Sequence, residues 1–65
     1  MLEKALAAAQ SGDADAQFKL GLMYYDGKHT EPDRAKAAQW ILKAAKQGHT
    51  GAAFNIGLFY ARGQG

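Results

Sequence analysis

Few side chains in this sequence have a type and spacing that could support catalysis. The two histidines, His29 and His49, belong to no HExxH or similar metal-ligand motif, and we interpret both as solvated loop residues. Ser11 directly precedes the glycine that ends a predicted helix, so a turn is favoured over a nucleophile. Asp13 and Asp15 could form a carboxylate pair, but a helix N-cap and a first-turn charge explain both positions. The sequence therefore predicts no catalytic residue and indicates that the protein is not an enzyme.

Binding of phosphate or nucleic acid has equally little support. Residues 63–65, Gly-Gln-Gly, follow no predicted strand and lack the Lys-Ser or Lys-Thr pair of a phosphate-binding loop. Lys36, Lys43 and Lys46 share one face of a predicted helix, which we interpret as solvated, with a weak anionic contact as the alternative. The formal net charge is only +2. We therefore expect no nucleic-acid partner, no metal and no cofactor.

Composition indicates an all-α fold. The chain has 65 residues, no cysteine and one proline. It is rich in alanine and poor in β-branched residues, which is typical of helices. This length permits one small domain, residues 1–65, whose stability is marginal without a staple or a neighbour. No apolar run approaches a membrane span and the first residues lack a signal-peptide layout, so we expect a soluble chain without a membrane partner, in a compartment that is not predicted.

An internal repeat organises the chain. When the sequence is shifted by 36 residues, ten of the 29 resulting pairs are identical. The identical pairs are Leu6/Leu42, Ala8/Ala44, Ala9/Ala45, Gly12/Gly48, Ala16/Ala52, Phe18/Phe54, Gly21/Gly57, Leu22/Leu58, Tyr24/Tyr60 and Gly27/Gly63. A period of this length in a helical composition is typical of helix pairs stacked into a solenoid.

The apolar spacing predicts four helices, at about residues 2–10, 14–25, 32–46 and 51–62. Asp13 is the expected N-cap of the second helix and Gly27 its stop. Thr30 and Asp33 have the spacing of a capping box for the third helix, with Pro32 in its first turn. The second and fourth helices are apolar around most of their circumference and are therefore expected to be the inner helices.

Short connections make consecutive helices antiparallel neighbours, so the sequence predicts a right-handed α/α solenoid. We divide it into an outer helix of a preceding repeat (1–12), a complete repeat (13–48) and an inner helix of a following repeat (49–65). Gly21 and Gly57 lie mid-helix, where glycine costs roughly 1 kcal/mol relative to alanine, so we expect another helix to pass close to each. The predicted core comprises Ala16, Leu20, Gly21, Tyr24, Trp40, Ile41, Ala44, Ala45, Ala52, Ile56, Gly57 and Tyr60.

Residues 16–27, Ala-Gln-Phe-Lys-Leu-Gly-Leu-Met-Tyr-Tyr-Asp-Gly, resemble the first helix of a Sel-one-like repeat (SLR), a branch of the tetratricopeptide-type solenoids. The resemblance continues through Asp33, Lys36, Ala37, Trp40, Lys43, Ala44, Ala45, Gln47 and Gly48, and returns in the second copy at Ile56, Gly57, Tyr60 and Gly63. It covers essentially the whole chain, and the departures are His29, Thr30 and Ile41. The resemblance implies a helical solenoid that serves as a non-catalytic scaffold or adaptor for a peptide or protein.

The resemblance also implies where a partner binds. In related solenoids one side of the inner helices lines a concave groove, and here that side carries Phe18, Leu22, Tyr25, Phe54 and Leu58. Polar contacts that orient the partner would come from Asp15, Lys19 and Asn55. Packing between repeats is the alternative role of the apolar residues.

Two other functions stay open at this point. The chain begins with an outer helix and ends with an inner one, so open ends of different copies could pair into a ring, a filament or a dimer. Such a self-associating building block could be natural, excised or engineered. Cysteine-rich bacterial relatives of the family are linked to β-lactam binding or hydrolysis, but this chain has neither their cysteines nor a Ser-Lys nucleophile arrangement, which disfavours an enzyme.

Overall fold

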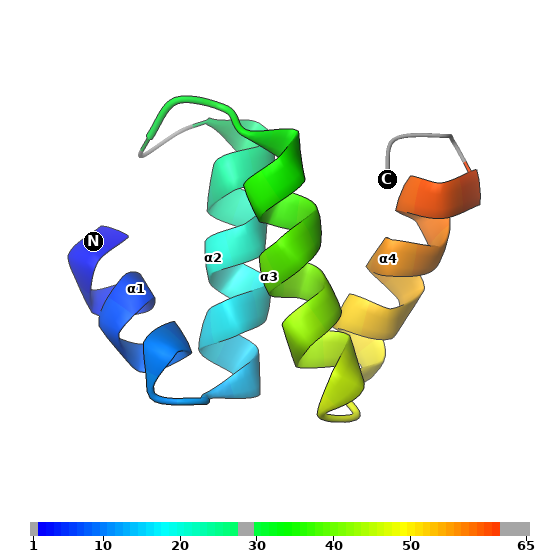
Figure 1. The fold of residues 1–65 in the computed structure, drawn as a ribbon, viewed down its shortest axis with the longest axis horizontal. Helices are drawn as coiled ribbons and strands as arrows, with labels where there is room; N and C mark the ends of the chain where they lie inside the picture. The colour runs from blue at the N-terminus through cyan, green and yellow to red at the C-terminus, as the bar shows by residue number, and fades with distance from the viewer. Residues whose placement is uncertain (1, 28–29, 62–65) are drawn as a thin grey trace.

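Four helices follow one another in the part of the chain that the structure describes. The computed structural model describes residues 2–27 and 30–61, in which the helices are α1 (Leu2–Gln10), α2 (Ala14–Asp26), α3 (Arg34–Lys46) and α4 (Thr50–Ala61). Within these two ranges there is no strand. Helix α2 packs against both α1 and α3, and α3 packs against α4, so that α1 and α4 lie on opposite sides of the central pair (Figure 1). The fold is therefore an all-α solenoid, as the sequence predicts.

Helix α2 has the two ends that its sequence predicts. The backbone N–H of Ala16 donates to the Asp13 carboxylate at 3.1 Å, which satisfies one of the unpaired amides of the first turn. At the other end Gly27 has φ 72°, in the left-handed region, and its N–H donates to the carbonyl of Met23 at 2.8 Å. Both predictions of local capping for this helix are confirmed.

The predicted start of α3 is wrong by two residues. The helix begins at Arg34, and its N-cap is Asp33, whose carboxylate accepts from the Lys36 N–H at 3.0 Å. Thr30 forms no capping box, and Pro32 lies before the helix instead of in its first turn. The cause is a tertiary contact: the Asp33 N–H donates to the carbonyl of Tyr24 at 2.9 Å. That bond connects Asp33, whose backbone is extended (φ −146°, ψ 97°), to α2, and the helix therefore begins only at Arg34.

Helix α4 begins with a histidine cap that the sequence analysis missed. The Ala52 N–H donates to Nδ1 of His49 at 3.0 Å, which is the N-cap geometry with an imidazole as acceptor. The His49 side chain is only 18% exposed, so its interpretation as a solvated loop residue is wrong. His29 and residues 62–65 lie outside the described residues, as does the side chain of Tyr60.

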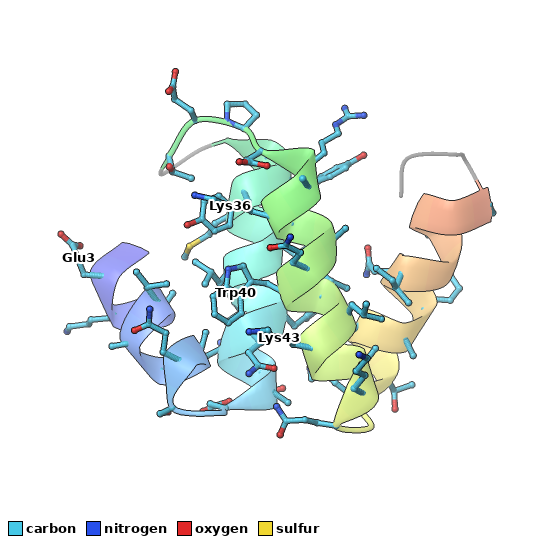
Figure 2. The ribbon with its side chains drawn as sticks, viewed as in Figure 1. Glu3, Lys36, Trp40 and Lys43 are labelled. Carbon is cyan, nitrogen blue, oxygen red and sulfur yellow. The ribbon has the colours of Figure 1, made fainter. Side chains whose placement is uncertain are left out.

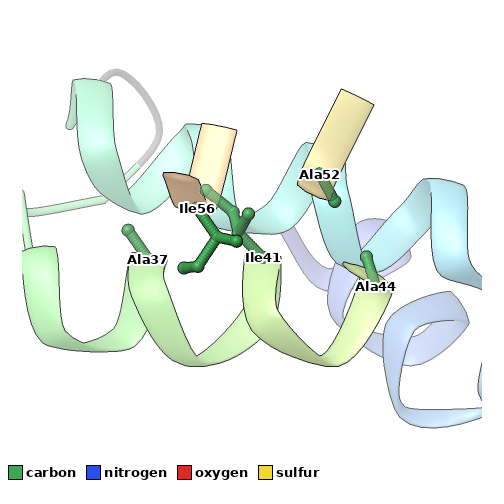
Figure 3. Packing of buried hydrophobic residues seen from close by; sticks show 5 residues of the cluster. All are labelled: Ala37, Ile41, Ala44, Ala52 and Ile56. Carbon is green, nitrogen blue, oxygen red and sulfur yellow. The ribbon is translucent and has the colours of Figure 1, made fainter. Parts of the chain in front are cut away.

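Two small clusters form the core. One lies between α3 and α4 and consists of Ala37, Ile41, Ala44, Ala52 and Ile56 (Figure 3). The other lies between α1 and α2 and consists of Ala9, Ala16 and Leu20. Leu20 and Ile41 are fully buried, and each contributes roughly 1.5–3 kcal/mol by leaving water. The alanines let neighbouring helices approach closely, so the core excludes water through close helix packing instead of through large side chains.

Gly21 and Gly57, which are 36 residues apart, have different surroundings. A Cβ built at Gly21 would overlap the Ile41 side chain and lie 3.0 Å from the carbonyl oxygen of Ala37. Glycine is therefore required where α2 crosses α3. Gly57 is exposed, and a Cβ there would meet nothing within 4 Å. The expectation that another helix passes close to Gly57 is not met among the described residues, because α4 packs against α3 through its other face.

Candidate functional site

The residues predicted to line a groove lie on α2 and α4, and we call this set the inner-helix face (Phe18, Leu22, Tyr25, Phe54 and Leu58, with the polar Asp15, Lys19 and Asn55). Phe54 is the most open of the apolar members, with 69% of its surface exposed. Asp15 and Lys19 are exposed, and Asn55 and Leu58 are half-buried. The inner-helix face therefore includes one large exposed apolar side chain, together with polar side chains that are exposed or half-buried.

The α2 members of this face also contribute to the core. Phe18, Leu22 and Tyr25 are half-buried and pack against the cluster between α3 and α4. Tyr25 in addition has the Arg34 guanidinium 5.2 Å from its ring centroid. Groove lining and inter-repeat packing are thus not exclusive roles, because a half-buried side chain has one side in the core and the other toward solvent.

A His–Asp–Phe contact fixes one end of the inner-helix face. Nε2 of His49 lies 2.8 Å from Oδ1 of Asp15, and its ring lies 4.7 Å from the Phe18 ring. Since Nδ1 accepts from a backbone amide, Nε2 carries the proton and donates to the carboxylate. This contact connects α2 to the start of α4. Sequence reasoning missed it because Asp15 and His49 are 34 residues apart in the sequence.

A buried glutamine forms a second polar connection that was not predicted. Gln17 is 6% exposed, the one polar side chain in the core of the described residues. Its Nε2 donates to the carbonyl of Ala9 at 3.0 Å, and its Oε1 accepts from Nε2 of Gln47 at 2.9 Å. A buried amide needs such partners, and here they orient α2 between its two neighbours.

The predicted core residues have different degrees of burial. The buried ones are Ala16, Leu20, Gly21, Ile41, Ala44, Ala52 and Ile56. Tyr24, Trp40 and Ala45 are half-buried, and Gly57 is exposed. Tyr24 and Trp40 pack against the cluster between α1 and α2, and Tyr24 also packs against the cluster between α3 and α4. Both side chains also line a surface pocket.

This pocket, here called the α1–α3 pocket, has a volume of about 350 Å³ and is lined by Leu6, Tyr24, Lys36, Gln39, Trp40 and Lys43. The Lys43 ammonium lies 4.7 Å from the Trp40 ring centroid, and the Lys36 ammonium lies 5.5 Å from that of Tyr24. Figure 2 shows Lys36, Trp40 and Lys43 along one side of α3. From the sequence the lysines were interpreted as a solvated face, with a weak anionic contact as the alternative. The pocket itself was not predicted, since the ring from α2 that contacts Lys36 is distant in sequence.

The described residues contain no group of three or more histidine, cysteine or acidic side chains that could hold a metal ion. Across the same residues, no helix has the length and apolar character needed to cross a membrane.

Comparison with known families assigns this architecture. A family model described as "Sel1 repeat" matches residues 14–49 and 50–65. The chain belongs to the Sel1 repeat family. The first matched segment has the 36-residue length of the internal period, and the second covers α4. Sel1 repeats are typical of non-catalytic modules that bind other proteins, and the family therefore supports a protein–protein interaction module.

Two curated proteins share Sel1-type sequence with the chain. The ERAD-associated E3 ubiquitin-protein ligase component HRD3A of Arabidopsis thaliana is 43% identical over 58 residues, which are 88% of this chain and 9% of that protein. The putative sel1-like repeat-containing protein L18 of Acanthamoeba polyphaga mimivirus is 46% identical over 43 residues, which are 66% of this chain and 7% of that protein. The Sel1 chain thus spans under a tenth of either relative. No solved structure matches it.

Proposed function

We propose that this Sel1-repeat chain binds a peptide or a protein segment on its inner-helix face, without catalysing a reaction. The observation that carries the proposal is the exposure of Phe54, at 69% the largest apolar side chain left open among the described residues. Burial of an exposed phenylalanine is favourable because it removes apolar surface from water. Such side chains are common anchors in protein interfaces. In this proposal the half-buried Phe18, Leu22, Tyr25 and Leu58 supply further apolar contact area for the partner.

Polar groups at the edge of the face suit a bound main chain. Lys19 and Asp15 are exposed on α2 and carry opposite charges. The Asn55 side chain donates to the carbonyl of Gly51 at 3.2 Å, which leaves its amide oxygen as an acceptor for a partner. We assign these three residues an orienting role, with residues 13–48 as the complete repeat unit and the segments on either side as parts of neighbouring repeats.

Selection of peptides on the chain tests this proposal. A displayed random peptide library would be panned on the chain, and the affinity of the recovered peptides would be measured by calorimetry. We expect Phe54→Ala to weaken their binding by about ten-fold or more. Gln10→Ala, an exposed change on α1 far from α4 in Figure 1, is the control and should have no effect. Peptides that bind the Phe54→Ala variant as tightly as the Gln10→Ala control would overturn the proposal.

Self-association is a second candidate, because the exposed side of α4 is unusual. Among the residues of α4 whose burial is described, the exposed ones are Thr50, Ala53, Phe54, Gly57 and Ala61, none of which is charged. The exposed side of α3 instead carries Arg34, Lys36, Lys43 and Lys46. An uncharged helix face is typical of a packing surface. In this alternative the α1 helix of a second copy docks on α4 in a head-to-tail contact.

Sedimentation equilibrium over a wide concentration range tests the second candidate. A weight-average mass that rises with concentration is expected, together with a return to the monomer mass in Phe54→Lys, which places a charge in the contact. A strictly monomeric wild-type chain at the highest concentration would rule out self-association. That result would leave the peptide-binding proposal intact, since peptide binding is measured on the monomer.

A further inference from the structure

The α1–α3 pocket contains an ordered row of cations around aromatic rings. Lys36, Trp40 and Lys43 follow the i, i+4, i+7 spacing of one helical face, so two ammonium groups flank the indole. The ammonium of Lys43 is held over Trp40 at 4.7 Å, and that of Lys36 over the Tyr24 ring at 5.5 Å. Such cation–π contacts restrict the lysine side chains before any ligand arrives, which lowers the entropy lost on binding.

The two lysines of the pocket form no ion pair among the described residues, although the Asp33 carboxylate accepts from the backbone N–H of Lys36. Within the part of the chain that the structure describes, no carboxylate lies within 4.0 Å of either ammonium group, and the Asp15 carboxylate contacts the His49 ring instead. Glu3 lies on α1, and its carboxylate points away from the lysines in Figure 2. Leu6 and the two aromatic rings provide apolar surface between the charges. The pocket therefore has positive charge at its ends and an apolar floor.

We propose that the α1–α3 pocket binds an acidic segment of a partner protein, with two carboxylates on Lys36 and Lys43 and an apolar side chain between them on Trp40. The two lysines are separated by two turns of α3, about 10 Å along the helix axis. In an extended peptide, residues i, i+2 and i+4 point to the same side and span about 13 Å. Because lysine side chains are flexible, their ammonium groups can reach carboxylates at this slightly larger separation. The peptide sequence that fits the pocket is therefore acidic–x–apolar–x–acidic.

This pocket is distinct from the inner-helix face. Its residues come from α1, the end of α2 and the α1-facing side of α3, whereas the inner-helix face comes from α2 and α4. The inference therefore goes beyond the proposed function and does not depend on it. Its test can fail or succeed whether or not Phe54 anchors a partner.

The single tryptophan of the chain makes the test direct, because Trp40 is both the floor of the pocket and the only indole emitter. An unlabelled peptide Gly-Glu-Ser-Leu-Ser-Glu-Gly, acetylated and amidated at its ends, would be titrated into the 65-residue chain. We expect a saturable change in Trp40 emission that weakens as salt is added. The same peptide with glutamine for both glutamates should give little or no change.

Three lysines of α3 provide matched variants. Lys36→Gln and Lys43→Gln should each weaken peptide binding about two- to five-fold, and the double variant more strongly. Lys46→Gln removes the same charge from the same helix but outside the pocket, and should leave affinity unchanged at moderate salt. Phe54→Ala should also leave it unchanged. All four side chains are exposed, and circular dichroism verifies that each variant is folded.

Specific results would overturn the proposal. An emission that does not respond to the acidic peptide would show that the pocket does not bind it. Equal losses of peptide affinity in Lys46→Gln and Lys43→Gln would show that binding depends on the overall charge of α3 and not on a specific site. An equal response to free glutamate at the same carboxylate concentration would show a small-anion site and would exclude recognition of a peptide segment.

Discussion

The side-chain amide of Gln47 donates a hydrogen bond of 2.9 Å to Oε1 of Gln17, a residue 30 positions earlier in the chain. Gln17 in turn donates to the carbonyl of Ala9 at 3.0 Å. One buried side chain thus connects the end of α1, the body of α2 and the turn after α3. In a core made largely of alanine, this polar connection restricts how the three helices are placed relative to one another.

Replacing Gln17 by alanine should destabilise the protein by about 1–3 kcal/mol, since it removes two hydrogen bonds and leaves the Ala9 carbonyl without this partner. Gln47→Ala should cost less, because Gln47 is exposed and Gln17 keeps its bond to Ala9. Urea unfolding followed by circular dichroism measures both values. Equal costs for the two variants would contradict the central role of Gln17.

Alanine at the two mid-helix glycines should have opposite effects. Gly21→Ala inserts a methyl into Ile41 and the Ala37 carbonyl, so we expect a loss of about 1–3 kcal/mol. Gly57→Ala enters open space and gains helix propensity, so we expect a stabilisation of about 0.5–1 kcal/mol. Thermal unfolding of the two variants gives the comparison. A destabilising Gly57→Ala would mean that another segment covers α4 in solution.

The start of α3 can be verified with a pair of loop variants. Asp33→Ala removes the carboxylate that caps the Lys36 N–H and should cost about 1 kcal/mol. Thr30→Ala should change stability by only a few tenths of a kcal/mol, since Thr30 does not cap the helix. If Thr30→Ala were instead the more costly of the two in urea unfolding, the capping box would be the correct description of this helix start.

The histidine cap of α4 makes a further prediction. His49→Ala removes the acceptor for the Ala52 N–H and the ring contact with Phe18, and should cost about 1–2 kcal/mol. His49→Asn is the matched variant, because asparagine is a good N-cap and should recover part of the loss. Asp15→Ala should cost less than His49→Ala, since Asp15 is 79% exposed. Amide exchange of the first turn of α4 detects the loss of the cap directly, and unchanged exchange in His49→Ala would exclude that role.

Features that depend on neighbours in sequence were predictable. The apolar period, Asp13 and Gly27 act within three or four residues, so they determine where α2 begins and ends without help from the rest of the chain. Asp33 shows the limit of this reasoning. Two side chains, Thr30 and Asp33, had suitable types for a cap, and the choice between them depended on the hydrogen bond from Asp33 to Tyr24 across the loop.

The internal repeat shows most clearly which features depend on the local sequence and which depend on the tertiary structure. Sequence identity placed Gly21 and Gly57 in the same role, and their local helices are indeed alike, because helix formation depends on residues nearby. Their surroundings differ, because α2 packs closely against α1 on one side and α3 on the other, whereas α4 packs mainly against α3 and leaves Gly57 facing open space. The sequence by itself thus determined the four helices, their order and the all-α solenoid. The tertiary structure decided which of the two glycines is crowded and that the His49 ring contacts the Asp15 carboxylate. It also decided that two lysines of the face interpreted as solvated line a pocket. Each of these features requires residues that are distant in the sequence to come together in space.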